Sequence, residues 1–322
     1  MKRMSYADAG VDIDEEEQAV AGIISAVGGT EHVTLNGHRL VMCTDGVGSK
    51  VLIADQMQQW DTVGIDCMAM NVNDALCMGA RPLAFVDYLA MEKTDKEKAA
   101  AIAAGLRKGA DIAGIPIVGG ETATLPEIIR GFDLAGTCVA VVEHELPQNI
   151  EPGNVVIGLR SSGLHSNGYT LARKVFTENG YDYGDVLPGA EETIGEALLK
   201  PTCIYVRETL ALWDTVDVKG ISHVTGSGLR NLKRLNSQVC FSIDEPFEPQ
   251  HILKVIQELG NVTDREMYQT FNMGMGLAIV VAEGDVDAAL DVLAKHSEME
   301  AQVVGRVTEG TGVELPSQEL RY

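Results

Sequence analysis

Four glycine-containing turns each follow an apolar run and carry an ionisable or hydroxyl side chain. They are TDGVGSK (44–50), VGGETAT (118–124), SSGLHSNG (161–168) and HVTGSGL (223–229). Glycine lets backbone N–H groups approach an anion closely, and a helix that starts after the turn adds a favourable dipole. One such turn is typical of ordinary chain reversal, but four indicate a phosphate site built from several segments. Neither GxxxxGK[ST] nor GxGxxG occurs, which excludes a P-loop and a standard Rossmann site.

The first turn supplies the most complete set of groups for binding phosphate. Lys50 can stand as a point charge against a phosphate while the backbone of Gly46 and Gly48 approaches its oxygens. The alternative interpretation of Lys50 is a surface lysine at the end of a strand.

Carboxylates also occur in the apolar segment GIDCMAMNVNDALCMGARP (64–82). At 100° per residue, Asp66 and Asn73 lie about 20° apart on a helix and share a face, with Asp74 about 80° from Asp66. Carboxylates in such surroundings are costly unless they are paired or bind a cation. We expect Asp74, with Asp45 and Glu121, to supply oxygen ligands to Mg²⁺. The alternative is that Asp74 caps or hydrogen-bonds nearby backbone.

Two histidines lie in the remaining turns. His165 is flanked by hydroxyls and by Asn167, so it can donate a hydrogen bond to an anion or move a proton near neutral pH. The alternative is an exposed loop histidine without a chemical role. His223, at the end of an expected strand, is the weaker candidate.

The elements that must position these residues alternate between strands and helices, which predicts an α/β chain. A polar stretch with two prolines, 143–154, predicts a boundary between an N-terminal domain (1–148) and a C-terminal domain (149–322). Strands are expected at 39–43, 83–90, 115–118, 132–142, 155–159, 219–224, 238–243, 277–282 and 301–307, and helices at 61–78, 95–113, 168–179, 250–259 and 286–297, with a helical region at 193–213.

Composition restricts the possible partners. The chain has 322 residues, 25 of them basic and 47 acidic, and a net charge of −22 repels nucleic acid and anionic membranes. The six cysteines occur singly, which predicts reduced thiols rather than a disulfide framework or a zinc site. No apolar run approaches a membrane span and the N-terminus lacks a signal-peptide pattern, so we expect a cytoplasmic protein.

The quoted motifs resemble the aminoimidazole ribonucleotide synthetases, also called phosphoribosylformylglycinamidine cyclo-ligases, of purine biosynthesis. The resemblance spans almost the whole chain in family order. It rests on SYADAGVDID (5–14), TDGVGSK (44–50), GIDCMAMNVNDALCMGARPLAFVDYLA (64–90), GGETA (119–123), FDLAGTCVAVVE (132–143), GLRSSGLHSNGY (158–169), HVTGSGL (223–229) and EMYQTFNMGMGL (266–277).

The resemblance implies a two-domain PurM-like α/β (α+β) fold and a homodimer. In the dimer, the N-terminal mixed sheets pair into a central barrel beside the C-terminal α/β domains, with an ATP site at the interface. Catalytic roles are implied for His165, Lys50 and Asp74, and metal ligation for Asp45, Asp74 and Glu121. Nucleotide contacts are implied for Asp45, Gly46, Val47, Gly48, Ser49, Lys50, Asp66, Asn73, Glu121 and Thr122, and substrate contacts for Ser162, Gly163, His165, Ser166, Asn167, Thr225, Gly226 and Asn272.

The implied reaction is ATP- and Mg²⁺-dependent ring closure of formylglycinamidine ribonucleotide to aminoimidazole ribonucleotide, with release of ADP and phosphate. Phosphorylation of the formyl oxygen makes an iminophosphate, which the amidine nitrogen attacks. The alternatives are another ATP-dependent enzyme of the superfamily, such as a thiamine-phosphate or selenophosphate enzyme, and a maturation scaffold without turnover. The absence of Cys and Lys from 5–14 disfavours the selenophosphate enzyme, and the C-terminal sequence PSQELRY, which has no cysteine, disfavours the scaffold.

Overall fold

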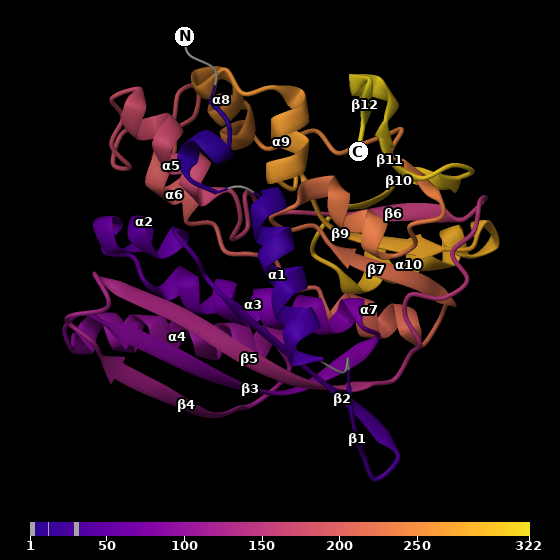
Figure 1. The fold of residues 1–322 in the computed structure, drawn as a ribbon, viewed down its shortest axis with the longest axis horizontal. Helices are drawn as coiled ribbons and strands as arrows, with labels where there is room; N and C mark the ends of the chain where they lie inside the picture. Colours follow the sequence, from indigo (N-terminus) through magenta and orange to yellow (C-terminus); the bar gives the residue numbers. More distant parts are fainter. Residues whose placement is uncertain (1–3, 12, 29–31) are drawn as a thin grey trace.

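The computed structural model describes residues 4–11, 13–28 and 32–322, which form two α/β halves (Figure 1). The N-terminal half holds a five-stranded sheet of order β1-β2-β5-β3-β4, and the C-terminal half a seven-stranded sheet of order β12-β11-β8-β10-β6-β9-β7. The expected boundary after residue 148 falls in the connection between β5 and β6, the strands on either side of it.

The elements have the following bounds. The strands are β1 (Val33–Leu35), β2 (His38–Gly46), β3 (Ala80–Met91), β4 (Ile117–Thr124), β5 (Phe132–Val142), β6 (Val155–Arg160), β7 (Val218–His223), β8 (Cys240–Ser242), β9 (Met275–Val281), β10 (Ala301–Thr308), β11 (Gly312–Leu315) and β12 (Leu320–Arg321). The α-helices are α1 (Ile13–Val27), α2 (Lys50–Met57), α3 (Asp61–Cys77), α4 (Lys96–Ala113), α5 (Tyr169–Glu178), α6 (Ile194–Leu198), α7 (Val206–Trp213), α8 (His251–Gly260), α9 (Asp264–Thr270) and α10 (Val286–His296), and the 3₁₀ helices are η1 (Ala7–Ala9), η2 (Gly228–Arg234), η3 (Glu283–Asp285) and η4 (Pro316–Gln318).

The five-stranded sheet is covered by helices on one face only. Along β3, Phe85 and Leu89 are buried, whereas Val86 and Tyr88 on the opposite face are exposed. This alternation follows from the two-residue period of a strand. Helix α3 packs on the covered face against β2, β3 and β5. The other face, which Met42 also lines, carries apolar side chains that no element in the described part of the chain covers.

Helix α3 lies at the centre of the molecule, between the N-terminal sheet and the C-terminal half (Figure 1). On its other flank it packs closely on α4 through glycines. A Cβ on Gly64 would overlap the backbone of α4, and a Cβ on Gly105 would overlap the Asp61 carbonyl oxygen. Asp95 begins α4 by accepting hydrogen bonds from the N–H groups of residues 97 and 98, and Gly114 ends it at φ 70°. The two helices are therefore held at backbone contact distance.

The structure confirms the two-domain α/β class and most of the expected elements, but it also differs from the expectation. Helices α1 and α9 were not expected. The segment GGETA is part of β4 instead of a turn, because it pairs in parallel with β3 along its whole length. Residues 50–57 form a helix that was not expected. The helical region 193–213 divides into α6 and α7 around Pro201, which cannot continue a helix. Within the described residues, no helix has the length and apolar character needed to cross a bilayer.

Candidate active site between the two halves

The polar face of α3 joins the N-terminal half to the segment 202–205 of the C-terminal half. Asp66 Oδ1 accepts hydrogen bonds from Thr202 N at 2.7 Å and Thr202 Oγ1 at 2.6 Å. Asn73 Nδ2 donates to Cys203 O at 2.9 Å, and its Oδ1 accepts from Tyr205 N at 3.0 Å. The common face predicted from the helical angle is therefore present. Both side chains are fully buried with partners inside the chain, so they hold the two halves in contact, and their predicted nucleotide contacts stay a prediction.

Lys50 is neither a surface lysine nor exposed to a ligand in this structure. Its Nζ lies 2.9 Å from Asp66 Oδ1 and 2.8 Å from Asp66 Oδ2, and it donates to His165 O at 3.0 Å and to Lys200 O at 2.7 Å. Burial lowers the pKa of the lysine, and the Asp66 carboxylate opposes that shift. Because these contacts use its donors, Lys50 holds the His165 loop against α2 and α3.

Asp45 and Asp74 lie near each other, beside His223. Burial raises the pKa of Asp45, and the charge of Asp74 raises it further, whereas a hydrogen bond from Gly46 N and the proximity of His223 oppose the rise. His223 Nδ1 and Asp74 Oδ1 are 2.9 Å apart, and Asn73 Nδ2 is 3.4 Å from His223 Nε2. The Asn73 donor leaves Nε2 as the acceptor, so His223 donates through Nδ1 to Asp74. His223, the weaker histidine candidate from the sequence, thus contacts Asp74 and Asn73.

Glu121 does not join this carboxylate pair within one chain. Asp45 pairs with Gly136 across β2 and β5, Gly136 with Asp87 across β5 and β3, and Asp87 with Gly120 across β3 and β4. Three strand spacings of about 4.8 Å therefore separate Asp45 from the neighbour of Glu121. The described residues contain no group of three His, Cys, Asp or Glu side chains that could hold a metal ion. The three-carboxylate set predicted from sequence is thus not assembled in the single chain.

His165 is buried between the two halves, 1% exposed and in the left-handed region at φ 61°. The N–H of Ser162 donates to its Nε2 at 3.3 Å, so the ring proton is assigned to Nδ1, which has no partner among the described groups. Burial holds the pKa of His165 well below 6.5, and the proximity of His223 and of the Lys50 ammonium group acts in the same direction. The ring is therefore neutral at physiological pH and offers one unpaired N–H.

Several predicted ligand residues make hydrogen bonds within the chain. Asn272 accepts from Ser161 Oγ at 2.9 Å and donates to Gly163 O at 2.8 Å. The hydroxyls of Ser162, Ser166 and Ser49 contact, in that order, Pro201 O at 2.5 Å, Thr202 Oγ1 at 3.0 Å and Thr170 Oγ1 at 3.3 Å. Val47 is fully buried, and Thr122 lies on the edge strand β4. Of the TDGVGSK glycines, Gly48 has positive φ and open space around it.

A cavity of about 670 Å³ opens beside these loops, between α1 and η2. Three predicted substrate residues, Asn167, Thr225 and Gly226, line it together with the basic side chains of η2. This cavity and the Asp45–Asp74 pair are linked through short loops, since Asn167 follows His165 by two residues and Thr225 follows His223 by two.

Comparison with known proteins shows the family to which the chain belongs. The family description "AIR synthase related protein, N-terminal domain" matches residues 19–142, and "AIR synthase related protein, C-terminal domain" matches residues 151–317. A protein of Methanosarcina mazei named phosphoribosylformylglycinamidine cyclo-ligase is 47% identical over 327 residues, covering 96% of each chain. The chain belongs to the phosphoribosylformylglycinamidine cyclo-ligase family.

Other members of the cyclo-ligase family match along the same length. The namesake from Methanothermobacter thermautotrophicus is 47% identical over 332 residues, covering 97% of each chain. Among solved structures, thiamine monophosphate kinase from Aquifex aeolicus shares the fold at 15% identity with a TM-score of 0.66, covering 96% of this chain and 99% of that one. The hydrogenase maturation protein HypE in complex with ATP aligns at 19% identity with a TM-score of 0.61, covering 89% and 82%. The cyclo-ligase family thus shares its fold with proteins of other names.

Proposed function

We propose that this chain catalyses the ATP-dependent cyclisation of formylglycinamidine ribonucleotide to 5-aminoimidazole ribonucleotide. The convergence of Asp45, Asp74 and His223 at the contact between the halves carries this proposal, because it places a carboxylate pair beside loops that can hold a ribonucleotide. Similarity to the cyclo-ligases over nearly the full length of the chain supports the choice of substrate. The six free cysteines support a reducing compartment, the cytoplasm.

Mg²⁺ fits the donor set of this site. Asp45 is half-buried beside a second carboxylate, a combination that is costly without a cation, and Asp74 is 46% exposed and therefore reachable. Mg²⁺ is usually held by one or two carboxylates together with substrate phosphates, so two carboxylates suffice. When bound, the ion neutralises charge on the transferring phosphoryl group.

The two histidines and Lys50 have separate roles in this reaction. His223 fixes the orientation of Asp74 by donating from Nδ1. The neutral His165 donates its free N–H toward the formyl oxygen, which polarises the carbon–oxygen bond. Of the two roles open to His165 from sequence, polarisation is favoured over proton acceptance because Nδ1 already carries a proton. Lys50 keeps this loop in place and does not touch the phosphates.

The reaction proceeds in two balanced steps. The formyl oxygen attacks the γ-phosphorus of ATP, ADP leaves, and the formamide nitrogen loses its proton, which gives the iminophosphate. The amidine nitrogen then forms a C–N bond to the former formyl carbon, the C–O bond breaks with loss of phosphate, and one proton leaves the nitrogen. Positioning and charge neutralisation supply the catalysis, without a protein nucleophile.

We also propose that two copies pair through the uncovered face of the N-terminal sheet. Met42 is 67% exposed and Val118 65%, and Tyr88 and Val86 continue the apolar surface. Exposed apolar surface of this kind is typical of an interface. Glu121 pairs with Tyr88 across the strands and lies on this face, so a second copy would cover it. Its predicted role in metal binding therefore depends on the dimer.

The experiment is to incubate the protein with formylglycinamidine ribonucleotide, ATP and MgCl₂. We expect a diazotisable aminoimidazole and ADP to form in equal amounts. Parallel reactions replace the substrate with thiamine monophosphate or with selenide, which test the two kinase-like alternatives. ADP release with thiamine monophosphate or AMP release with selenide, and no aminoimidazole from the first mixture, would overturn the proposal.

A His223→Asn variant tests the role of the pair in that reaction. Loss of an outer partner of a metal ligand typically costs 10- to 100-fold in activity or metal affinity, and we expect a loss of about that size. His251→Asn is the matched control, because His251 lies at the start of α8 and contacts Pro188 O instead.

A further inference from the structure

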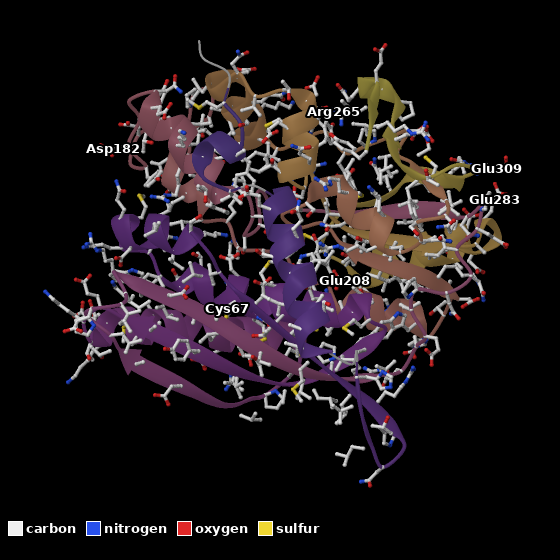
Figure 2. The ribbon with its side chains drawn as sticks, in the orientation of Figure 1. Cys67, Asp182, Glu208, Arg265, Glu283 and Glu309 are labelled. Atoms are coloured by element: carbon white, nitrogen blue, oxygen red, sulfur yellow. The ribbon has the colours of Figure 1, made fainter. Side chains whose placement is uncertain are left out.

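The cavity between α1 and η2 has a basic wall in a strongly acidic chain. The helix η2 presents Arg230, Lys233 and Arg234 within five residues, and all three line the cavity. Elsewhere acidic side chains dominate, as Asp182, Glu283 and Glu309 do at the outer edge of the molecule in Figure 2. The chain has a net charge of −22, so a cluster of basic side chains on this wall is opposite in sign to the rest of the protein. Such a cluster indicates an anionic ligand.

Neutral donors complete the cavity. Asn167 Nδ2 is buried and has no hydrogen-bond partner among the described groups, although an unpaired buried amide is costly. Asn231 donates to Thr225 Oγ1 at 3.2 Å, which leaves the hydroxyl proton of Thr225 to donate elsewhere. At Gly226 a Cβ would lie 3.1 Å from Asn167 Oδ1, so the missing side chain keeps the loop close to the amide. Charged and neutral donors therefore converge on one space.

The opposite wall is apolar and comes from α1, which Figure 1 shows beside the C-terminal half. Val20, Ala21 and Ile24 line the cavity from this helix. An apolar wall reduces the access of water and strengthens the attraction between an anion and the basic side chains.

We propose that this cavity binds a phosphomonoester dianion, the 5′-phosphate of the ribonucleotide substrate. This inference rests on the proposed function. The loops that end in Asn167 and Thr225 begin at His165 and His223, and two extended residues span about 7 Å. A phosphate held by Lys233 and Arg234 therefore places the other end of a ribonucleotide near the two imidazoles. The proposed site for the nucleotide phosphates, at Asp45 and Asp74, does not line this cavity.

The test compares Lys233→Ala and Arg234→Ala with the control Lys295→Ala, which removes an exposed lysine at the end of α10. A hydrogen bond to a charged group contributes about 1.5–3 kcal/mol, so each cavity variant should raise KM for formylglycinamidine ribonucleotide by about 10-fold or more. The value of kcat and KM for ATP should stay within about twofold, because the lost contact is the same in ground and transition states. Lys295→Ala should change none of the three.

Inorganic phosphate is the second probe. It should compete with formylglycinamidine ribonucleotide, not with ATP, and its inhibition constant should rise about 10-fold in Lys233→Ala. An Arg234→Lys variant keeps the positive charge, so its KM for formylglycinamidine ribonucleotide should lie much closer to that of the wild type than the KM of Arg234→Ala does. The inference is overturned if KM for the ribonucleotide is unchanged in both alanine variants. It is also overturned if KM for ATP rises instead, since the cavity would then take a nucleotide phosphate.

Failure of the proposed function is distinguishable from failure of this inference. If the wild-type protein forms no aminoimidazole, calorimetry with inorganic phosphate and with ribose 5-phosphate replaces the kinetics. Binding by the wild type that Lys233→Ala weakens supports the cavity, and equal binding by both proteins, or none by either, rejects it.

Discussion

Replacing Lys50 with methionine tests whether the buried ion pair holds the two halves together. Methionine keeps the length of the side chain but removes the ammonium group that lies within 3 Å of Asp66, His165 O and Lys200 O. The carboxylate of Asp66 then stays fully buried with only Thr202 as donor. Its charge is no longer compensated, so the folded state loses stability.

The magnitude follows from the burial of both partners. Breaking a buried ion pair by removing one partner costs about 3–5 kcal/mol. For a chain of this size, with about 2 °C of Tm for each kcal/mol, this corresponds to a fall of roughly 6–10 °C. Thermal unfolding followed by circular dichroism measures it. We expect kcat to fall as well, because His165 O loses the lysine that fixes its loop.

Two comparisons make the result decisive. Lys108→Met removes an exposed lysine of α4 and should change stability by less than about 0.5 kcal/mol. The double variant Lys50→Met, Asp66→Asn removes the uncompensated charge and should recover part of the loss. If Lys50→Met melted within 1 °C of the wild type, the ion pair would not stabilise the contact between the halves and the reasoning would be wrong.

Three further outcomes are expected. Gly105→Ala should lower the free energy of unfolding by about 1–3 kcal/mol, because a Cβ there meets the Asp61 carbonyl oxygen. Gly22→Ala in α1, with open space around it, should raise the free energy of unfolding slightly. Chemical denaturation compares the two variants, and equal changes in unfolding free energy would contradict the packing of α3 on α4. Since the pKa of His165 is lowered on folding, the unfolded state takes up a proton first as the pH falls below about 6.5, and the stability present above that pH is lost. His165→Gln should therefore lose less Tm than the wild type between pH 7.5 and 5.5, and parallel curves would argue against a buried neutral ring. Mg²⁺ with ATP at 100 times the dissociation constant should stabilise the wild type by about 2.7 kcal/mol, and Asp74→Asn should lose most of that shift in a thermal assay; an undiminished shift would remove Asp74 from the metal site.

The sequence predicted what local periodicity decides. The 100° rotation per residue placed Asp66 and Asn73 on one face of α3, and the structure directs both at the segment 202–205. The cost of an unpaired carboxylate in an apolar helix also predicted that Asp66 would have a partner, which is Lys50.

What the sequence did not predict depends on the order of strands and on contacts between distant segments. Nothing local shows that β5 and β3 separate Asp45 from Glu121, and the glycines of GGETA are equally suited to a turn and to a strand beside Asp87. Likewise, Asp74 and His223 are 149 positions apart in the sequence, so no local motif predicts their hydrogen bond. The basic residues of η2 occur in the sequence LRNLKRL (229–235), but the sequence does not predict the cavity that they line.

The position of α3 between the two halves restricts how those halves can be exchanged during evolution. The polar face of α3 makes its hydrogen bonds with the C-terminal half. The boundary between the two matched domains therefore does not separate two parts that satisfy their buried polar groups independently. A chimaera that exchanges one half with a relative must carry complementary residues at Asp66, Asn73 and 202–205, or leave buried groups unpaired. Recombination at the inter-domain linker should therefore destabilise the protein unless the new half complements the polar face of α3. We expect the two halves to be inherited together.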